Sequence, residues 1–287
     1  MIREELFVKR RATVVIVNGN DRYKVQKKMQ LIAFLLVFLI LITYLYIHRY
    51  YVNNEFSESA TRLAMLNTNT VFSIDKIYLY SSAYATNNID SRPIWNLNVN
   101  QYTDIALYIN NRYSEGINYN NSIKSLTISD INFTKGKAGT PSLYYKDILN
   151  FANQSINEES KITDTLNFNI VTNELDTSNA SIYSNCQNPI TLSYVNKNVK
   201  ENYIIEDGSS TLKYDGNILR MTEVPMTSMK CTVSFKITLT NMYNHKYIAN
   251  VYIDIPLEDQ YTGESIYNGK IEKTLENSNL IKFFRIE

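Results

Sequence analysis

The stretch KKMQLIAFLLVFLILITYLYIHRYY, residues 27–51, decides how this chain of 287 residues is organised. Its residues 31–47 carry no charge, and thirteen of these seventeen residues are Leu, Ile, Val or Phe. Such a run favours insertion into a bilayer by about 5 kcal/mol. Because a helix of this length rises only about 25 Å, flanking residues must help it to cross a hydrocarbon core of about 30 Å. We therefore predict a transmembrane helix over residues 29–51.

Two other interpretations of this run are less favoured. A buried helix of a soluble protein would be shorter or would carry a polar stripe, whereas this run is apolar all round. A cleaved signal peptide has an apolar stretch of about 7–15 residues with small residues close behind it. Here the first such pattern comes only at Ser57 and Ser59. We therefore expect the segment to remain as a signal anchor.

The charges around the run predict its direction. The first thirty residues carry eight basic and three acidic side chains, whereas the whole chain has a net charge of only +1. Since basic residues stay on the cytoplasmic side, we expect a single-pass plasma-membrane protein with its N-terminus in the cytoplasm and its C-terminal domain outside the cell. The residues expected at the two faces of the lipid bilayer are Lys27 and Lys28 inside, and Tyr44, Tyr46, Tyr50 and Tyr51 outside.

The segments on either side of the anchor are short. Residues 1–28 form a basic tail in which Asn18 and Gly19 could turn a short β-hairpin, although a disordered tail fits equally well. Residues 52–70 form a neck whose apolar residues recur near the helical period. Outside the tail no basic patch is interleaved with aromatic residues, so we expect no nucleic-acid partner.

From Val71 onward, apolar and polar residues alternate with period 2 in about eleven short stretches. Clusters of Asn, Asp, Ser and Gly separate them, which is typical of turns. This pattern predicts a mainly β ectodomain of the antiparallel β-sandwich type. A helical patch near residues 145–156 leaves open whether there is one domain or two packed β subdomains, residues 71–160 and 161–287.

Cys186 and Cys231 are the only cysteines, and both lie in the expected extracellular part. An even number of cysteines in an oxidising compartment favours a disulfide, which would stabilise the fold by about 4 kcal/mol in the chain-entropy model. Two separate buried thiols are the alternative.

The sequence offers little catalytic chemistry. It has only two histidines, His48 and His245, which is too few for a histidine-based metal site, and His245 follows Cys231 where a sortase-like enzyme has its histidine first. Other weak candidates are a calcium loop near Asp130, a Ser228 and Lys230 pair, and the carboxylates Asp254 and Glu258; each reads more simply as a polar loop or strand end. We expect no metal, no cofactor and no enzymatic activity.

Several stretches of the exterior part resemble uncharacterised single-pass membrane-anchored proteins of AT-rich Gram-positive bacteria. They are YTDIALYINN, GTPSLYYKD, NCQNPITLSYVNKNVKENY, LKYDGNILR, KCTVSF and NVYIDIPLED. The resemblance implies a location on the bacterial cell surface, and it favours pairing of Cys186 with Cys231. It implies no assigned activity.

Two functional hypotheses follow. The first is a non-enzymatic binding or adhesion module whose partner is a protein or a cell-wall polymer; Tyr78, Tyr80 and Tyr84 alternate along one predicted strand and could supply a contact surface. The alternative is a structural subunit of a cell-envelope assembly that works through its helix and tail. An extracellular enzyme using Asp254 and Glu258 is a less favoured third hypothesis.

Overall fold

A computed structural model describes residues 27–47, 71–91, 94–111, 122–175, 179–206 and 217–286. The chain divides into two units, Met1–Arg62 and Leu63–Glu287. The predicted hairpin around Asn18, the neck, and the interface residues Tyr50 and Tyr51 lie outside the described residues.

The described residues of the first unit form one helix, Lys27–Ile47, of 21 residues. A helix of this length rises about 32 Å, close to the thickness of a hydrocarbon core. Its large apolar side chains are 45% to 73% exposed, and none of them packs into a protein core. The hydroxyl of Thr43 donates to the carbonyl of Leu39 at 2.7 Å, so this polar group is satisfied within the helix. The helix is long and apolar enough to span a membrane, as predicted, with Lys27 and Lys28 in its first turn and Tyr44 and Tyr46 near its end.

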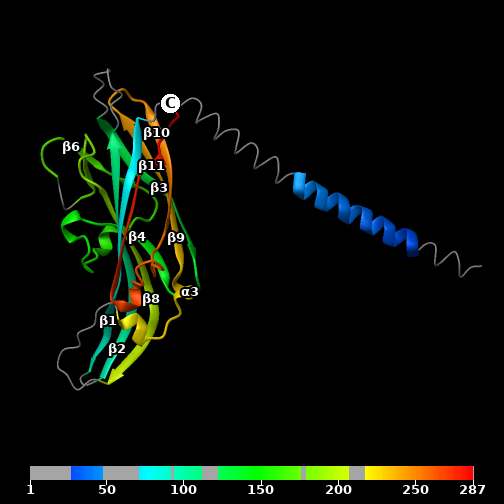
Figure 1. Cartoon of the computed structure of the whole chain (residues 1–287), viewed down its shortest axis with the longest axis horizontal. Helices are drawn as coiled ribbons and strands as arrows, with labels where there is room; N and C mark the ends of the chain where they lie inside the picture. Colours follow the sequence, from blue (N-terminus) through cyan, green and yellow to red (C-terminus); the bar gives the residue numbers. More distant parts are fainter. Residues whose placement is uncertain are drawn as a thin grey trace, which may run out of the picture. The chain divides into compact units, whose positions relative to one another are not determined.

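The second unit contains two five-stranded sheets whose labelled strands run along its length (Figure 1). Sheet A has the order β11 (Lys270–Lys282), β1 (Phe72–Ser91), β2 (Ile94–Asn111), β8 (Ile190–Glu206), β4 (Thr140–Tyr145). Sheet B has the order β12 (Phe284–Arg285), β10 (Lys246–Asp254), β9 (Cys231–Asn241), β3 (Ile123–Lys135), β5 (Leu166–Asn167). All pairs in these two sheets are antiparallel.

Short elements complete this unit. A small parallel pair joins β6 (Asn169–Val171) to β7 (Ser181–Tyr183). The helical turns are η1 (Ile148–Asn150), η2 (Glu158–Ser160), α2 (Ile218–Met221), α3 (Met226–Met229) and η3 (Ile266–Asn268).

The alternation in the sequence decides which face of each strand is buried. In β9 every second residue is buried, from Cys231 through Val233, Phe235, Ile237 and Leu239. These side chains join one hydrophobic cluster with inward-facing residues of sheet A, among them Leu79 and Leu107. The predicted mainly β, antiparallel sandwich is therefore confirmed.

The division into residues 71–160 and 161–287 does not separate two subdomains. β2 pairs with β8, β1 with β11 and β3 with β9, so both sheets take strands from both stretches. The expected helical patch at residues 145–156 is reduced to the single turn η1, and it follows a strand of sheet A instead of linking two domains. The sequence left the number of domains open because strand partners distant in the sequence leave no local signal.

The expected disulfide is not formed, and both thiols are free and buried. Cys186 lies two residues after Ser184, whose carbonyl accepts from the backbone N–H of Ile123. Ile123 pairs with Asn241, the last residue of β9, so Cys186 lies near that end of the strand. Cys231 is the first residue of the same strand. A strand of this length spans about 30 Å, whereas bridged cysteines have Cα atoms within about 7 Å of each other.

Candidate functional site

The tyrosines of β1 lie on the face of sheet A that points away from sheet B. A register shift between Ile74 and Lys76 sets this arrangement, because beyond it Ile77 and Leu79 point into the core. Tyr78, Tyr80 and Tyr84 therefore point the other way, since successive residues of a strand alternate between its faces. The structure thus brings together the three tyrosines that the sequence singled out.

Neighbouring strands extend this row of rings. Tyr102 of β2 lies 6.2 Å from Tyr80 and 6.0 Å from Tyr84, measured between ring centroids. Such pairs of aromatic side chains on adjacent strands stabilise a sheet and fix the orientation of the rings. We call the set of aromatic side chains on this side of sheet A the tyrosine face: Tyr78, Tyr80, Tyr84, Tyr102, Tyr108, Tyr144 and Phe151.

Residues 146–161 cross this side of the sheet after β4 ends. Phe151 stacks on Tyr78 with ring centroids 5.5 Å apart and planes 27° from parallel. Ile156 packs against a small buried cluster that contains Tyr102 and Tyr144. This cover explains why consecutive residues in the middle of β2 are buried on both faces, where simple alternation would leave every second one exposed.

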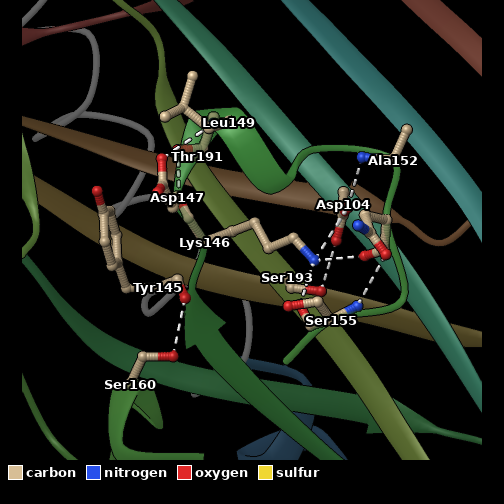
Figure 2. Close-up of polar contacts among 11 residues, drawn as sticks. Asp104, Tyr145, Lys146, Asp147, Leu149, Ala152, Ser155, Ser160, Thr191 and Ser193 are labelled. Atoms are coloured by element: carbon tan, nitrogen blue, oxygen red, sulfur yellow. Dashed lines mark hydrogen bonds and ion pairs between the residues drawn. The ribbon is translucent and has the colours of Figure 1, made fainter. Parts of the chain in front are cut away.

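A buried ion pair holds the crossing segment in place (Figure 2). The ammonium group of Lys146 lies 3.5 Å from Oδ2 of Asp104, and the two side chains are 3% and 0% exposed. Oδ1 of Asp104 accepts from the hydroxyl of Ser193 at 2.6 Å, and Oδ2 accepts from the backbone N–H of Ala152 at 2.9 Å. Burial raises the pKa of Asp104 to about 6, although Lys146 and these two donors act in the opposite direction.

The other contacts of Lys146 are with the segment itself. Its ammonium group donates to the carbonyl oxygens of Asn153 at 2.6 Å and Ser155 at 2.7 Å. Burial lowers the pKa of Lys146, and the carboxylate of Asp104 raises it. With three acceptors around it, the nitrogen acts as a donor that orders residues 153–155. The ion pair thus fixes the position of the segment that carries Phe151.

Lysine side chains lie over three of the rings. Lys270 is 5.7 Å from the ring centroid of Tyr80, and Lys197 is 5.8 Å from that of Tyr144. Lys76 lies 5.6 Å from the ring of Tyr108. These are cation–π distances. The ring of Tyr144 is itself buried, whereas those of Tyr80 and Tyr108 are partly exposed, so the exposed part of the tyrosine face combines these two ring surfaces with positive charge.

Two glutamates form ion pairs with two of these lysines. Glu272 accepts from the hydroxyl of Tyr78 at 2.6 Å and pairs with Lys270 at 2.7 Å, and Lys270 lowers its pKa most. Burial and then the bond to Glu272 raise the pKa of Tyr78 to about 12. Glu158 pairs with Lys197 at 2.7 Å, and that contact lowers the pKa of Glu158. Each carboxylate keeps an exposed edge on which further donors could bind.

The polar candidates from the sequence lie elsewhere. Asp130 lies within β3 and forms an ion pair with Lys236 at 2.5 Å. The hydroxyl of Ser228 donates to the carbonyl of Pro225 in a local turn, and the backbone of His245 donates to Asn241. Within the described residues, no group of three or more His, Cys, Asp or Glu side chains could hold a metal ion. The structure does bring Lys230, Asp254 and Glu258 together, in a cleft at the end of sheet B.

Sequence reasoning missed Asp104, Lys146, Tyr102 and Phe151. A partial signal for the ion pair was present, because Asp104 is the only charged residue of β2. A charge in a buried position needs a partner of opposite sign, although the pattern does not say which one. No family model, curated protein or solved structure matches this chain.

Proposed function

We propose that this chain is a non-enzymatic binding protein of the cell surface, and that its tyrosine face contacts a glycan chain of the cell wall. The helix Lys27–Ile47 would anchor it in the plasma membrane with the basic N-terminus in the cytoplasm and the β-sandwich outside. The observation that carries the proposal is the row of half-buried tyrosine rings on β1, flanked by charged side chains with exposed edges.

The chemistry of the face favours a sugar over an apolar protein surface. Sugar rings place their C–H faces on aromatic rings and bond their hydroxyls to carboxylates and ammonium groups. The outward-facing residues of β1 and β11 in this region include no aliphatic side chain: they are Lys76, Tyr78, Tyr80, Ser82, Tyr84, Thr86, Lys270, Glu272, Thr274 and Glu276. An apolar protein partner would instead need aliphatic area to bury.

Preorganisation supports the same proposal. Tyr80 and Tyr84 are both held against Tyr102, and Tyr78 is held by Phe151 and Glu272. Rings that are already fixed lose little conformational entropy when a ligand binds. The ion pair of Asp104 with Lys146 adds to this order by fixing the segment that carries Phe151.

The test is binding of the full chain, in lipid nanodiscs, to isolated Gram-positive cell-wall polysaccharide, measured by co-sedimentation. The double variant Tyr80→Ala and Tyr84→Ala removes two rings and should weaken binding by about tenfold or more. The matched control is Tyr252→Ala with Tyr261→Ala, which removes two tyrosines that are 70% and 100% exposed and do not belong to the tyrosine face. The control should bind as the unaltered chain does.

Two results would overturn the proposal. One is the absence of binding to wall polysaccharide by the unaltered chain. The other is equal binding by the tyrosine-face variant and the control. Binding to a wall protein that survives removal of all polysaccharide would assign the face to a protein partner instead.

A further inference from the structure

A cleft with a volume of about 630 Å³ lies at the end of sheet B, away from the tyrosine face. It forms where β3 ends at Lys135, β9 begins at Cys231 and β10 ends at Asp254, with Lys273 of β11 contributed by sheet A. In Figure 1 this end of β9 is found next to α3. Small-molecule sites typically enclose about 300–1,000 Å³, so the cleft is large enough for one.

The floor of the cleft is apolar. Cys231, Ile255 and Leu257 are each 6% exposed, and Pro256 beside them is also buried. Met226 of α3 is half-buried and closes one side. A floor of this kind binds an apolar group by removing it from water.

Backbone contacts preform the walls. The N–H of Gly136 donates to the carbonyl of Lys230 at 2.7 Å, and that of Ala138 donates to the carbonyl of Ser228 at 2.9 Å. A Cβ atom at Gly136 would lie 2.3 Å from the carbonyl oxygen of Ser228, so only glycine permits this approach. The N–H of Ile255 donates to the carbonyl of Cys231 at 2.9 Å and extends the sheet under the cleft.

The rim is charged, with an excess of lysine. Its ammonium groups belong to Lys135, Lys230 and Lys273, and its carboxylates to Asp254 and Glu258. The ammonium group of Lys135 donates to the carbonyl of Gly139 at 2.8 Å, and Asp254 accepts from the hydroxyl of Thr232 at 2.6 Å. Among the described residues, the ammonium groups of Lys230 and Lys273 have no ion-pair or hydrogen-bond partner. They are therefore available to an anion from outside.

We infer that this cleft binds a small monocarboxylate that carries an apolar body. The apolar body would lie on Ile255, Pro256 and Leu257, and the carboxylate would bind Lys230 and Lys273. Glu258 in the same rim opposes a second negative charge, which selects a single carboxylate over a phosphate or a dicarboxylate. This site is separate from the tyrosine face and does not depend on the function proposed for it.

The test uses the full chain in lipid nanodiscs and two small, water-soluble probes, N-acetyl-L-leucine and N-acetyl-L-leucinamide. Binding is followed by NMR of ¹³C-labelled methyl groups of Met226 and Ile255. We expect N-acetyl-L-leucine to shift both methyl signals saturably. The amide, which lacks the charge but keeps the apolar body, should bind at least about tenfold more weakly.

A pair of variants locates the carboxylate. Lys230→Gln with Lys273→Gln should weaken binding of N-acetyl-L-leucine by about tenfold or more. The control, Lys200→Gln with Lys282→Gln, removes two exposed lysines outside the cleft and should leave binding unchanged. Tyr80→Ala with Tyr84→Ala should also leave it unchanged. The inference is overturned if neither probe gives a saturable shift, if both probes bind the unaltered chain equally, or if the cleft variant binds as its control does.

Discussion

The carboxylate of Asp104 on β2 lies 3.5 Å from the ammonium group of Lys146, which directly follows β4, and almost none of either side chain reaches solvent. Each oxygen of Asp104 also accepts one hydrogen bond, from Ser193 or from Ala152, and Lys146 donates to two backbone carbonyls. The pair therefore links two strands of sheet A to the segment that crosses them. Its removal should affect both the stability of the fold and the position of Phe151.

Lys146→Met should be strongly destabilising, because it leaves Asp104 buried without its counter-charge. We expect the free energy of unfolding to fall by about 3–5 kcal/mol, measured by urea denaturation. The double variant Asp104→Leu with Lys146→Met should recover most of this loss. Lys197→Met breaks the ion pair with Glu158, whose members are 37% and 63% exposed, and should cost no more than about 1 kcal/mol. Similar losses for Lys146→Met and Lys197→Met would contradict the role given to the buried pair.

The raised pKa of Asp104 predicts how stability changes with pH. Its folded pKa is about 6 against an ordinary value of 3.8, so between these values the folded state binds more protons than the unfolded state. The contribution of Asp104 is therefore fully present below pH 4 and is lost as the pH rises through 6, by about 3 kcal/mol at most. The free energy of unfolding of the unaltered chain, minus that of Asp104→Asn, should therefore decrease as the pH rises from 4 to 7. A difference that is constant with pH would contradict it.

The two cysteines should behave as independent buried thiols. We expect two free thiols per chain when the protein is unfolded without reductant and reacted with a thiol reagent. Cys186→Ala and Cys231→Ala should also have additive effects on the free energy of unfolding, because the residues lie near opposite ends of β9. Coupled effects, or the loss of both thiols together, would indicate a disulfide.

Gly136→Ala should displace residues 226–230 from the end of β3. The added Cβ would meet the backbone carbonyl of Ser228, which cannot move without breaking the adjacent hydrogen bonds, so we expect a loss of about 1–3 kcal/mol in thermal or urea unfolding. It should also abolish binding of N-acetyl-L-leucine in the cleft. Gly263→Ala is a useful comparison, because its cost comes only from a φ of +72° with no atom within 4 Å. It should leave the cleft intact.

The proposed membrane orientation can be tested with introduced cysteines, because both native thiols are buried. Tyr261→Cys places a thiol at a fully exposed position of the β unit, and Lys9→Cys places one in the basic tail. In intact cells a membrane-impermeant maleimide should label Tyr261→Cys, and it should label Lys9→Cys only after lysis. The opposite pattern would reverse the proposed orientation.

Local patterns were enough to predict the main elements of this protein. The charge-free run from residue 31 to 47 predicted an apolar helix, and period-2 alternation from residue 71 onward predicted antiparallel strands with one buried face. The same alternation placed Tyr78, Tyr80 and Tyr84 on one face. These predictions hold because helix and strand periods act on residues that are neighbours in the sequence.

Tertiary structure alone decided which distant residues meet. The pairing of β2 with β8 made one domain of what could have been two, and opposite ends of β9 kept Cys186 and Cys231 apart. The same pairing put Ser193 beside Asp104, and the path of the chain after β4 brought Lys146 to them. Many strand orders satisfy one alternating pattern, and they differ in free energy through the packing of side chains and the pairing of buried charges. That difference arises between residues far apart in the sequence, so no local stretch of this chain contains it.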